Sequence, residues 1–124
     1  MKTRTILAAG AAAATLILAN AFPAHAGAQA SGTVKVPYQS GKNVYAEATL
    51  HGPNAAGTKL CVYLNAQHPY VPDVTIASKC ATIDAGTVRV SAPRPACGNY
   101  TTWAAATYKG RTTWQAQSLY KLFC

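Results

Sequence analysis

The sequence predicts an all-β protein, a sandwich of two sheets built from about seven antiparallel strands. Short segments rich in Val, Tyr, Thr and Ala recur along the chain, and clusters of Gly, Pro and Asn separate them. No stretch carries the sustained apolar spacing of an amphipathic helix. Turn signals at such regular intervals are typical of a sandwich, and 124 residues are enough for one domain.

The start of the chain has the organisation of a secretory signal peptide, residues 1–26. Two basic residues precede an apolar run over 6–19, and small residues follow at the positions that a signal peptidase reads. Cleavage after Ala30 is a second option. An uncleaved anchor is the alternative, but a membrane-spanning helix needs about 20 apolar residues. We therefore expect cleavage, and a secreted, extracellular domain over residues 27–124.

Alternation identifies the inner faces of two strands in this domain. Over residues 44–50 apolar side chains alternate with polar ones, so one face of the segment is expected in the core. Residues 86–91 alternate in the same way, and turn formers such as those at 51–54 separate the segments. The seven expected strands are 32–38, 43–50, 58–64, 73–78, 86–91, 99–108 and 112–123.

The last two expected strands form a hairpin. A two-residue turn at 109–110 is favoured because Gly supplies one of the positive φ angles that such turns need. Pairing of Tyr108 with Arg111 then places Trp103 opposite Ala116; a four-residue loop would keep this facing and a three-residue loop would reverse it. The face expected in the core consists of Cys97, Trp103, Ala105, Trp114, Ala116, Tyr120, Leu122 and Cys124. The face expected in solvent consists of Tyr100, Tyr108, Arg111, Gln115, Gln117 and Lys121.

The four cysteines are expected to form two disulfides. Their number is even, and an exported protein meets an oxidising compartment. A zinc site is the alternative, but no two cysteines have the usual C-x₂₋₄-C spacing. Four cysteines allow three pairings. Because the hairpin register brings Cys97 and Cys124 together as diagonal neighbours, it favours that pair and leaves Cys61 with Cys80.

Two segments resemble a known group of proteins. The stretch from Cys97-Gly98-Asn99-Tyr100 to Trp103, with its hairpin and the terminal Cys124, resembles small secreted actinobacterial proteins of immunoglobulin-like build and unknown function. Residues 48–52 and 60–64 are similar to earlier strands of that group. The resemblance implies an immunoglobulin-like sandwich and export, and it implies no activity.

Few side chains are available for catalysis. Glu47, Asp73 and Asp84 are the only acidic residues, and neither a G-x-S-x-G elbow nor an H-E-x-x-H motif is present. His51 and His68 stand beside turn formers, where exposed loop histidines are common. We therefore expect no enzymatic activity, no metal site and no cofactor. A weak hydrolase, dependent on one of the three carboxylates, is the alternative.

The domain is basic. The whole chain carries 11 Lys and Arg against 3 Asp and Glu, and removal of residues 1–26 leaves a charge of about +6. Scattered charges of this kind are typical of a solubilising surface, and they also attract anionic polymers outside the cell, such as wall teichoic acids or acidic polysaccharide. Neither nucleic acid binding nor membrane integration is expected, since the chain has no recognition motif and no second long apolar run. The basic residues after residue 26 are Lys35, Lys42, Lys59, Lys79, Arg89, Arg94, Lys109, Arg111 and Lys121.

The expected function is binding of an extracellular ligand, with a structural role in the envelope as a related possibility. The expected ligand is an anionic cell-wall polymer or another secreted protein. The expected binding surface is the solvent face of the hairpin, because Tyr gives a rigid amphipathic contact and Arg with Gln adds hydrogen bonds, a mixture typical of binding surfaces. A cationic antimicrobial protein is one alternative. A protease inhibitor that presents Arg94 in the loop 91–96 is another, although Pro95 disfavours the extended docking that such inhibitors use.

Overall fold

The computed structural model describes residues 30–68, 70–94 and 97–124, and the expected signal peptide lies outside these residues. The described residues form eight strands and no helix, which confirms the all-β prediction. The seventh expected strand is divided into β7 and β8. The strands are β1 (Ser31–Ser40), β2 (Asn43–His51), β3 (Lys59–His68), β4 (Val71–Thr82), β5 (Gly86–Pro93), β6 (Gly98–Tyr108), β7 (Arg111–Gln117) and β8 (Lys121–Phe123).

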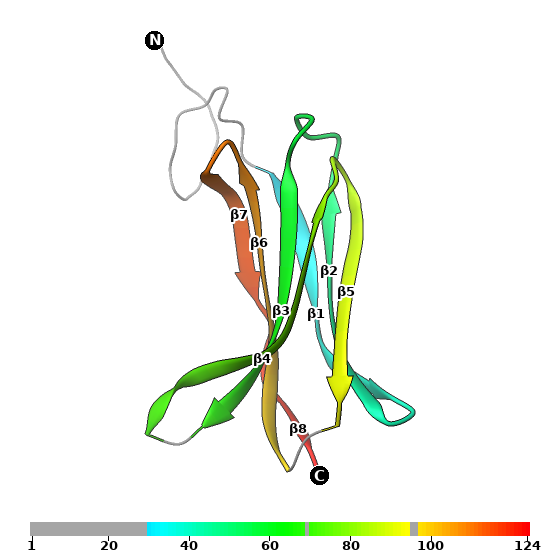
Figure 1. The fold of residues 1–124 in the computed structure, drawn as a ribbon, viewed down its shortest axis with the longest axis vertical. Helices are drawn as coiled ribbons and strands as arrows, with labels where there is room; N and C mark the ends of the chain where they lie inside the picture. Colours follow the sequence, from blue (N-terminus) through cyan, green and yellow to red (C-terminus); the bar gives the residue numbers. More distant parts are fainter. Residues whose placement is uncertain (1–29, 69, 95–96) are drawn as a thin grey trace.

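The strands form two antiparallel sheets that face each other (Figure 1). One sheet has the order β1-β2-β5. The other has the order β4-β3-β6-β7, and β8 pairs with β6 at the end that β7 leaves free. This division of seven consecutive strands between two sheets is an immunoglobulin-like arrangement, as expected. We call the second sheet, with β8, the five-stranded sheet.

The core lies between the two sheets and is made of alternate residues of each strand. In β2 the side chains of Val44, Ala46, Ala48 and Leu50 are fully buried, which confirms the predicted inner face of that strand. The matching residues of β3 and β6 complete the core from the other sheet, and Val88 contributes from β5. Small Ala side chains on both sheets let the layers approach closely around larger Leu and Val side chains.

Both predicted disulfides are present. Cys61 and Cys80 join β3 to the edge strand β4, with Cα atoms 4.0 Å apart. Cys97 and Cys124 join the start of β6 to the end of the chain. In the chain-entropy model each bond stabilises the fold by about 3 kcal/mol, because it restricts the unfolded chain. Two disulfides in so small a domain indicate an oxidising compartment.

The β6–β7 hairpin has the expected turn but not the expected register. Residues 109 and 110 both have positive φ, 50° and 78°, and Tyr108 pairs with Arg111 as predicted. After the next pair, Thr107 with Thr112, Thr113 is an extra residue in β7. As a result Ala106 pairs with Trp114, whereas the simple register would pair Ala105 with it. A β-bulge of this kind displaces the later pairs by one position.

Because of the bulge, the face of β6 that was expected in solvent lies in the core, and the face expected in the core lies outside. Tyr100 was expected in solvent, but it is only 4% exposed and packs against Phe123, with ring centroids 5.9 Å apart. Trp103 was expected in the core opposite Ala116, but it lies on the outer face of the sheet opposite Gln117. Both predictions are wrong for one reason, since a shift of one residue moves every side chain of a strand to the other face.

The end of the chain differs from the prediction as well. The chain leaves the ladder after β7, and the Ser118 hydroxyl accepts a hydrogen bond from the backbone N–H of Thr102 at 2.9 Å. When pairing resumes in β8, Phe123 is the buried residue. Tyr120 and Leu122, which were expected in the core, are exposed instead.

Candidate functional site

The structure does not bring the six expected binding residues to one surface. Tyr100 is in the core. Tyr108 and Arg111 lie at the turn between β6 and β7, while Lys121 lies in β8 at the opposite end of the sandwich (Figure 1). Only the two glutamines of β7 remain on the outer face of the five-stranded sheet, opposite Ala105 and Trp103 of β6. Those two glutamines are Gln115 and Gln117.

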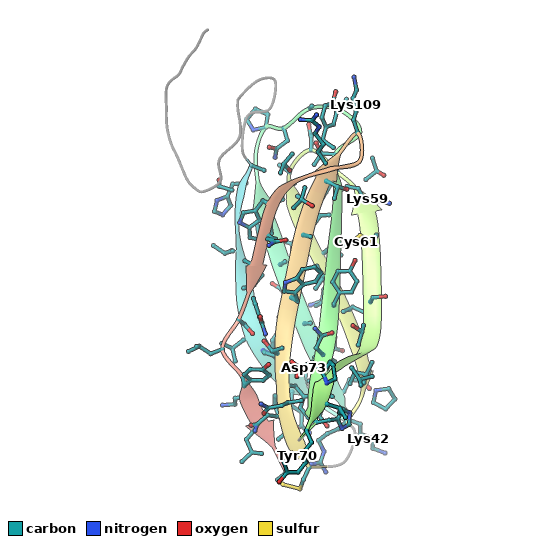
Figure 2. All side chains as sticks on the ribbon, turned by 90° about the vertical axis from the view of Figure 1, so that its left-hand side faces the viewer. Lys42, Lys59, Cys61, Tyr70, Asp73 and Lys109 are labelled. Carbon is teal, nitrogen blue, oxygen red and sulfur yellow. A yellow bond between two sulfur atoms is a disulfide. The ribbon has the colours of Figure 1, made fainter. Side chains whose placement is uncertain are left out.

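That outer face carries a pair of aromatic rings. Tyr63 of β3 and Trp103 of β6 are direct cross-strand partners, and their ring centroids are 5.1 Å apart. Both side chains are half-buried, so each ring leaves part of its surface to solvent. The view in Figure 2 looks onto this sheet, with Cys61 at one end of the face and Asp73 at the other. We call Tyr63, Trp103, Asn65, Gln115 and Gln117 the aromatic–amide face.

Amide groups surround the aromatic pair. Asn65 lies two residues beyond Tyr63 in β3, and its Oδ1 accepts a hydrogen bond from the Thr75 hydroxyl at 2.7 Å. This bond orients the amide and leaves the NH₂ group of Asn65 available for other acceptors. The exposed Gln115 side chain makes no hydrogen bond to another residue that the structure describes. The face therefore offers donors and acceptors beside an apolar platform.

A tyrosine–carboxylate bridge closes one end of this face. The Tyr120 hydroxyl donates a hydrogen bond to Oδ2 of Asp73 at 2.6 Å, which links the segment after β7 to β4 across the sheet. The hydrogen bond to the Asp73 carboxylate, with partial desolvation, raises the pKa of the Tyr120 hydroxyl above its usual value. The bridge holds two chain segments together and occupies the carboxylate of Asp73.

The outer face of the other sheet carries a second polar cluster, which sequence reasoning missed. Across β1, β2 and β5 the residues Lys35, Glu47 and Arg89 are neighbours, and Tyr38 stacks on Tyr45 with ring centroids 5.4 Å apart. Lys35 pairs with Oε2 of Glu47 at 3.1 Å, and the Tyr38 hydroxyl donates to Oε1 at 2.9 Å. Alternation showed that Glu47 points outward, but its partners follow only from the strand pairing.

These contacts satisfy the cluster internally. Partial burial opposes ionisation of Glu47, but the hydrogen bonds from Tyr38 and Lys35 and the charges of Lys35 and Arg89 outweigh it. The pKa of Glu47 therefore lies below its usual value. Both carboxylate oxygens are occupied, so the cluster is suited to holding three strands together. The cluster therefore has fewer free hydrogen-bonding groups for a ligand than the aromatic–amide face has.

The remaining candidate residues are dispersed. Glu47 and Asp73 lie on different sheets, and Asp84 lies in the turn between β4 and β5. His51 and His68 are both exposed, each at the end of its strand. In the part of the chain that the structure describes, no three His, Cys, Asp or Glu residues lie together in a way that could hold a metal ion.

The expected inhibitory loop is described only in part. Pro95 and Ala96 lie outside the described residues, and the backbone N–H of Arg94 donates to the carbonyl oxygen of Lys42 at 2.7 Å. This bond ties Arg94 to the turn between β1 and β2.

The described residues include no helix that is long and apolar enough to cross a membrane. Comparison of the chain with models of protein families, with curated proteins and with solved structures found no match.

Proposed function

We propose that this chain is a secreted, non-catalytic protein that binds an acidic polysaccharide of the cell envelope through the aromatic–amide face. The observation that carries the proposal is the Tyr63–Trp103 pair, half-open to solvent and bordered by amide side chains. Export is supported by the signal-like residues 1–26 and by the two disulfides.

The chemistry of a polysaccharide matches this face. The apolar side of a sugar ring packs on aromatic rings, while its hydroxyl groups exchange hydrogen bonds with amides, which both donate and accept. The row of outward side chains along β3 runs from Cys61 to Gln67. It extends the face over about 20 Å, because every second residue of a strand adds about 7 Å. A surface of this length accommodates several sugar units of an extended chain.

The surface charge favours an acidic polymer. All nine basic side chains of the described residues are exposed. The same residues include only three carboxylates, and the carboxylate of Glu47 is paired with Lys35 at 3.1 Å. The molecule therefore presents positive charge with little compensation, and such a surface attracts polyanions in a manner that salt weakens.

Retention on purified envelope polysaccharide tests the proposal. Replacement of Trp103 by Ala is expected to weaken retention about tenfold or more, as for aromatic residues at the centre of an interface. Gln115→Ala should weaken it by less, and added salt should weaken binding of every variant. An acidic polysaccharide should be retained better than a neutral one.

The other sheet supplies a matched control. Tyr45→Ala removes one ring of the Tyr38–Tyr45 stack, a comparable loss from the opposite outer face. This variant should bind like the unchanged protein. Equal binding by the Trp103→Ala and Tyr45→Ala variants, both verified as folded by thermal melts, would refute the proposed face.

A further inference from the structure

Exposed apolar side chains are concentrated at one end of the sandwich. Among the described residues seven large hydrophobic side chains are exposed, and six of them come from two short segments, 70–74 and 119–122. The seventh, Val36, lies in β1. We call the six residues the apolar end; they are Tyr70, Val71, Val74, Leu119, Tyr120 and Leu122.

The two segments form one surface. The hydrogen bond from Tyr120 to Asp73 joins them directly. A second row runs from Leu122 toward the β3–β4 hairpin, because Leu122 pairs with Asn99 and the Nδ2 of Asn99 donates to Oε1 of Gln67 in β3 at 3.2 Å. Figure 1 shows that the tip of the β3–β4 hairpin and β8 lie at the same end of the molecule. Exposed apolar side chains gathered at one end of a molecule in this way are typical of an interaction site.

Tyr70 projects from this surface. It is 103% exposed, so no residue that the structure describes packs on it, and it stands at the tip of the β3–β4 hairpin, away from the other strands (Figures 1 and 2). Its φ of 67° is in the left-handed region, which is unfavourable for a bulky residue. Neither packing nor backbone preference explains a tyrosine here, and unfavourable backbone at an exposed tip is characteristic of functional positions.

Basic side chains are also present at this end of the sandwich. Lys121 lies within β8, between Leu119 and Leu122. Lys42 and Arg94 lie at the same end of the sandwich, joined by a backbone hydrogen bond of 2.7 Å (Figures 1 and 2). The one acidic side chain within the patch, Asp73, is engaged by Tyr120. Among the described residues, this end carries Lys42, Arg94 and Lys121 against the carboxylate of Asp73, so its charge is mainly positive.

We propose that the apolar end docks on an anionic lipid surface. Tyr70, Val71 and Leu122 would enter the boundary between head groups and acyl chains, where an amphipathic aromatic side chain is favoured. Lys121, Lys42 and Arg94 would face the anionic head groups. A protruding apolar tip, with cationic side chains at the same end of the molecule, fits this use. The proposal is independent of the polysaccharide proposal, because it uses different residues.

Co-sedimentation with lipid vesicles tests this proposal. The protein, purified from the medium of an expressing host, should bind vesicles of phosphatidylglycerol and phosphatidylcholine in equal parts more tightly than vesicles of phosphatidylcholine alone. The double variant Tyr70→Ser/Val71→Ser should bind the mixed vesicles about tenfold less, or weaker still, because it removes two inserted apolar side chains. Lys121→Gln should reduce both the binding and its salt dependence.

Val36→Ser is the matched control, because Val36 is the one exposed large hydrophobic side chain outside the apolar end within the described ranges. This variant should bind like the unchanged protein. In a separate Tyr70→Trp variant, vesicles should shift the added fluorescence to shorter wavelength as the indole leaves water. All substituted side chains are exposed, so thermal melts should remain unchanged.

Several outcomes would overturn the proposal. These are equal binding by the Tyr70→Ser/Val71→Ser variant, an equal loss with Val36→Ser, or no preference for anionic vesicles. Absence of vesicle binding together with a dimer that the double variant abolishes would assign the apolar end to a second copy of this chain. The Trp103→Ala variant should still bind vesicles, and the Tyr70→Ser/Val71→Ser variant should still bind polysaccharide, so the two proposals fail separately.

Discussion

Thr101 and Thr102 show that the contribution of a buried hydroxyl group to stability depends on whether it has a hydrogen-bond partner. Both side chains are fully buried, on opposite faces of β6. The Thr101 hydroxyl donates to the carbonyl oxygen of Ser118 at 2.9 Å. The Thr102 hydroxyl faces the core and has no hydrogen-bond partner among the described residues. A buried hydroxyl group without a partner costs stability, because it has lost its bonds to water.

Replacing each threonine by valine should therefore have opposite effects. Thr102→Val keeps the shape and removes the unpaired hydroxyl, so it should raise the free energy of unfolding by about 1 kcal/mol. Thr101→Val removes a satisfied hydrogen bond and should lower this free energy by about 1 kcal/mol. Urea unfolding of the two variants measures both changes. The same sign of change in both variants would contradict this assignment.

At the scale of the element, the β6–β7 turn determines how the hairpin forms. Lys109 and Gly110 both have positive φ, the combination that a two-residue turn with the twist of the flanking strands needs. Gly110 adopts it without strain, but Lys109 carries a side chain into a region that favours Asn. The turn is therefore not optimal at its first position.

Two substitutions test this interpretation of the turn. Lys109→Asn should raise the free energy of unfolding by about 0.5–1 kcal/mol, because Asn-Gly suits this turn type. Gly110→Ala should lower it by about 1 kcal/mol, although a Cβ at Gly110 would meet no atom within 4 Å. Urea unfolding measures both. An unchanged midpoint for Gly110→Ala would mean that the turn relaxes at little cost.

At the scale of the whole molecule, the two disulfides attach peripheral strands to the rest of the fold. Cys61–Cys80 attaches the edge strand β4, and Cys97–Cys124 attaches β8, a strand of three residues. A domain this small buries a limited core, so the covalent links are a large part of its margin of stability. The loops that they close differ little in length, with separations of 19 and 27 residues.

Replacement of either cystine by two serines should therefore lower the free energy of unfolding by about 3 kcal/mol. The local consequences should differ. Without Cys97–Cys124, amide hydrogens of β8 should exchange rapidly while those of β3 stay protected, because β8 has few other contacts. Hydrogen exchange followed by mass spectrometry distinguishes the two variants. Uniform loss of protection in both would show that the domain opens only as a unit.

The sequence by itself determined the fold class, the positions of the strands, the buried face of β2 and the hairpin turn. It also favoured the disulfide pairing that the structure contains, although the hairpin register behind that choice is displaced by one residue. These features depend on local patterns, since alternation has a period of two and Gly at a turn acts on its own residue. Of the six residues expected to bind, Gln115 and Gln117 lie on the surface that we propose, and Tyr100 lies in the core.

Only the tertiary structure decided which side chains share a surface. Tyr63 meets Trp103 through the pairing of β3 with β6, and the two residues are far apart in the sequence. The bulge at Thr113 lies where the carbonyl oxygen of this residue accepts a hydrogen bond from the backbone N–H of Ala30, a contact between distant segments. Backbone hydrogen bonds of this kind are independent of side-chain pattern, so the sequence contains no local signal for the shift that turned Tyr100 inward and Trp103 outward.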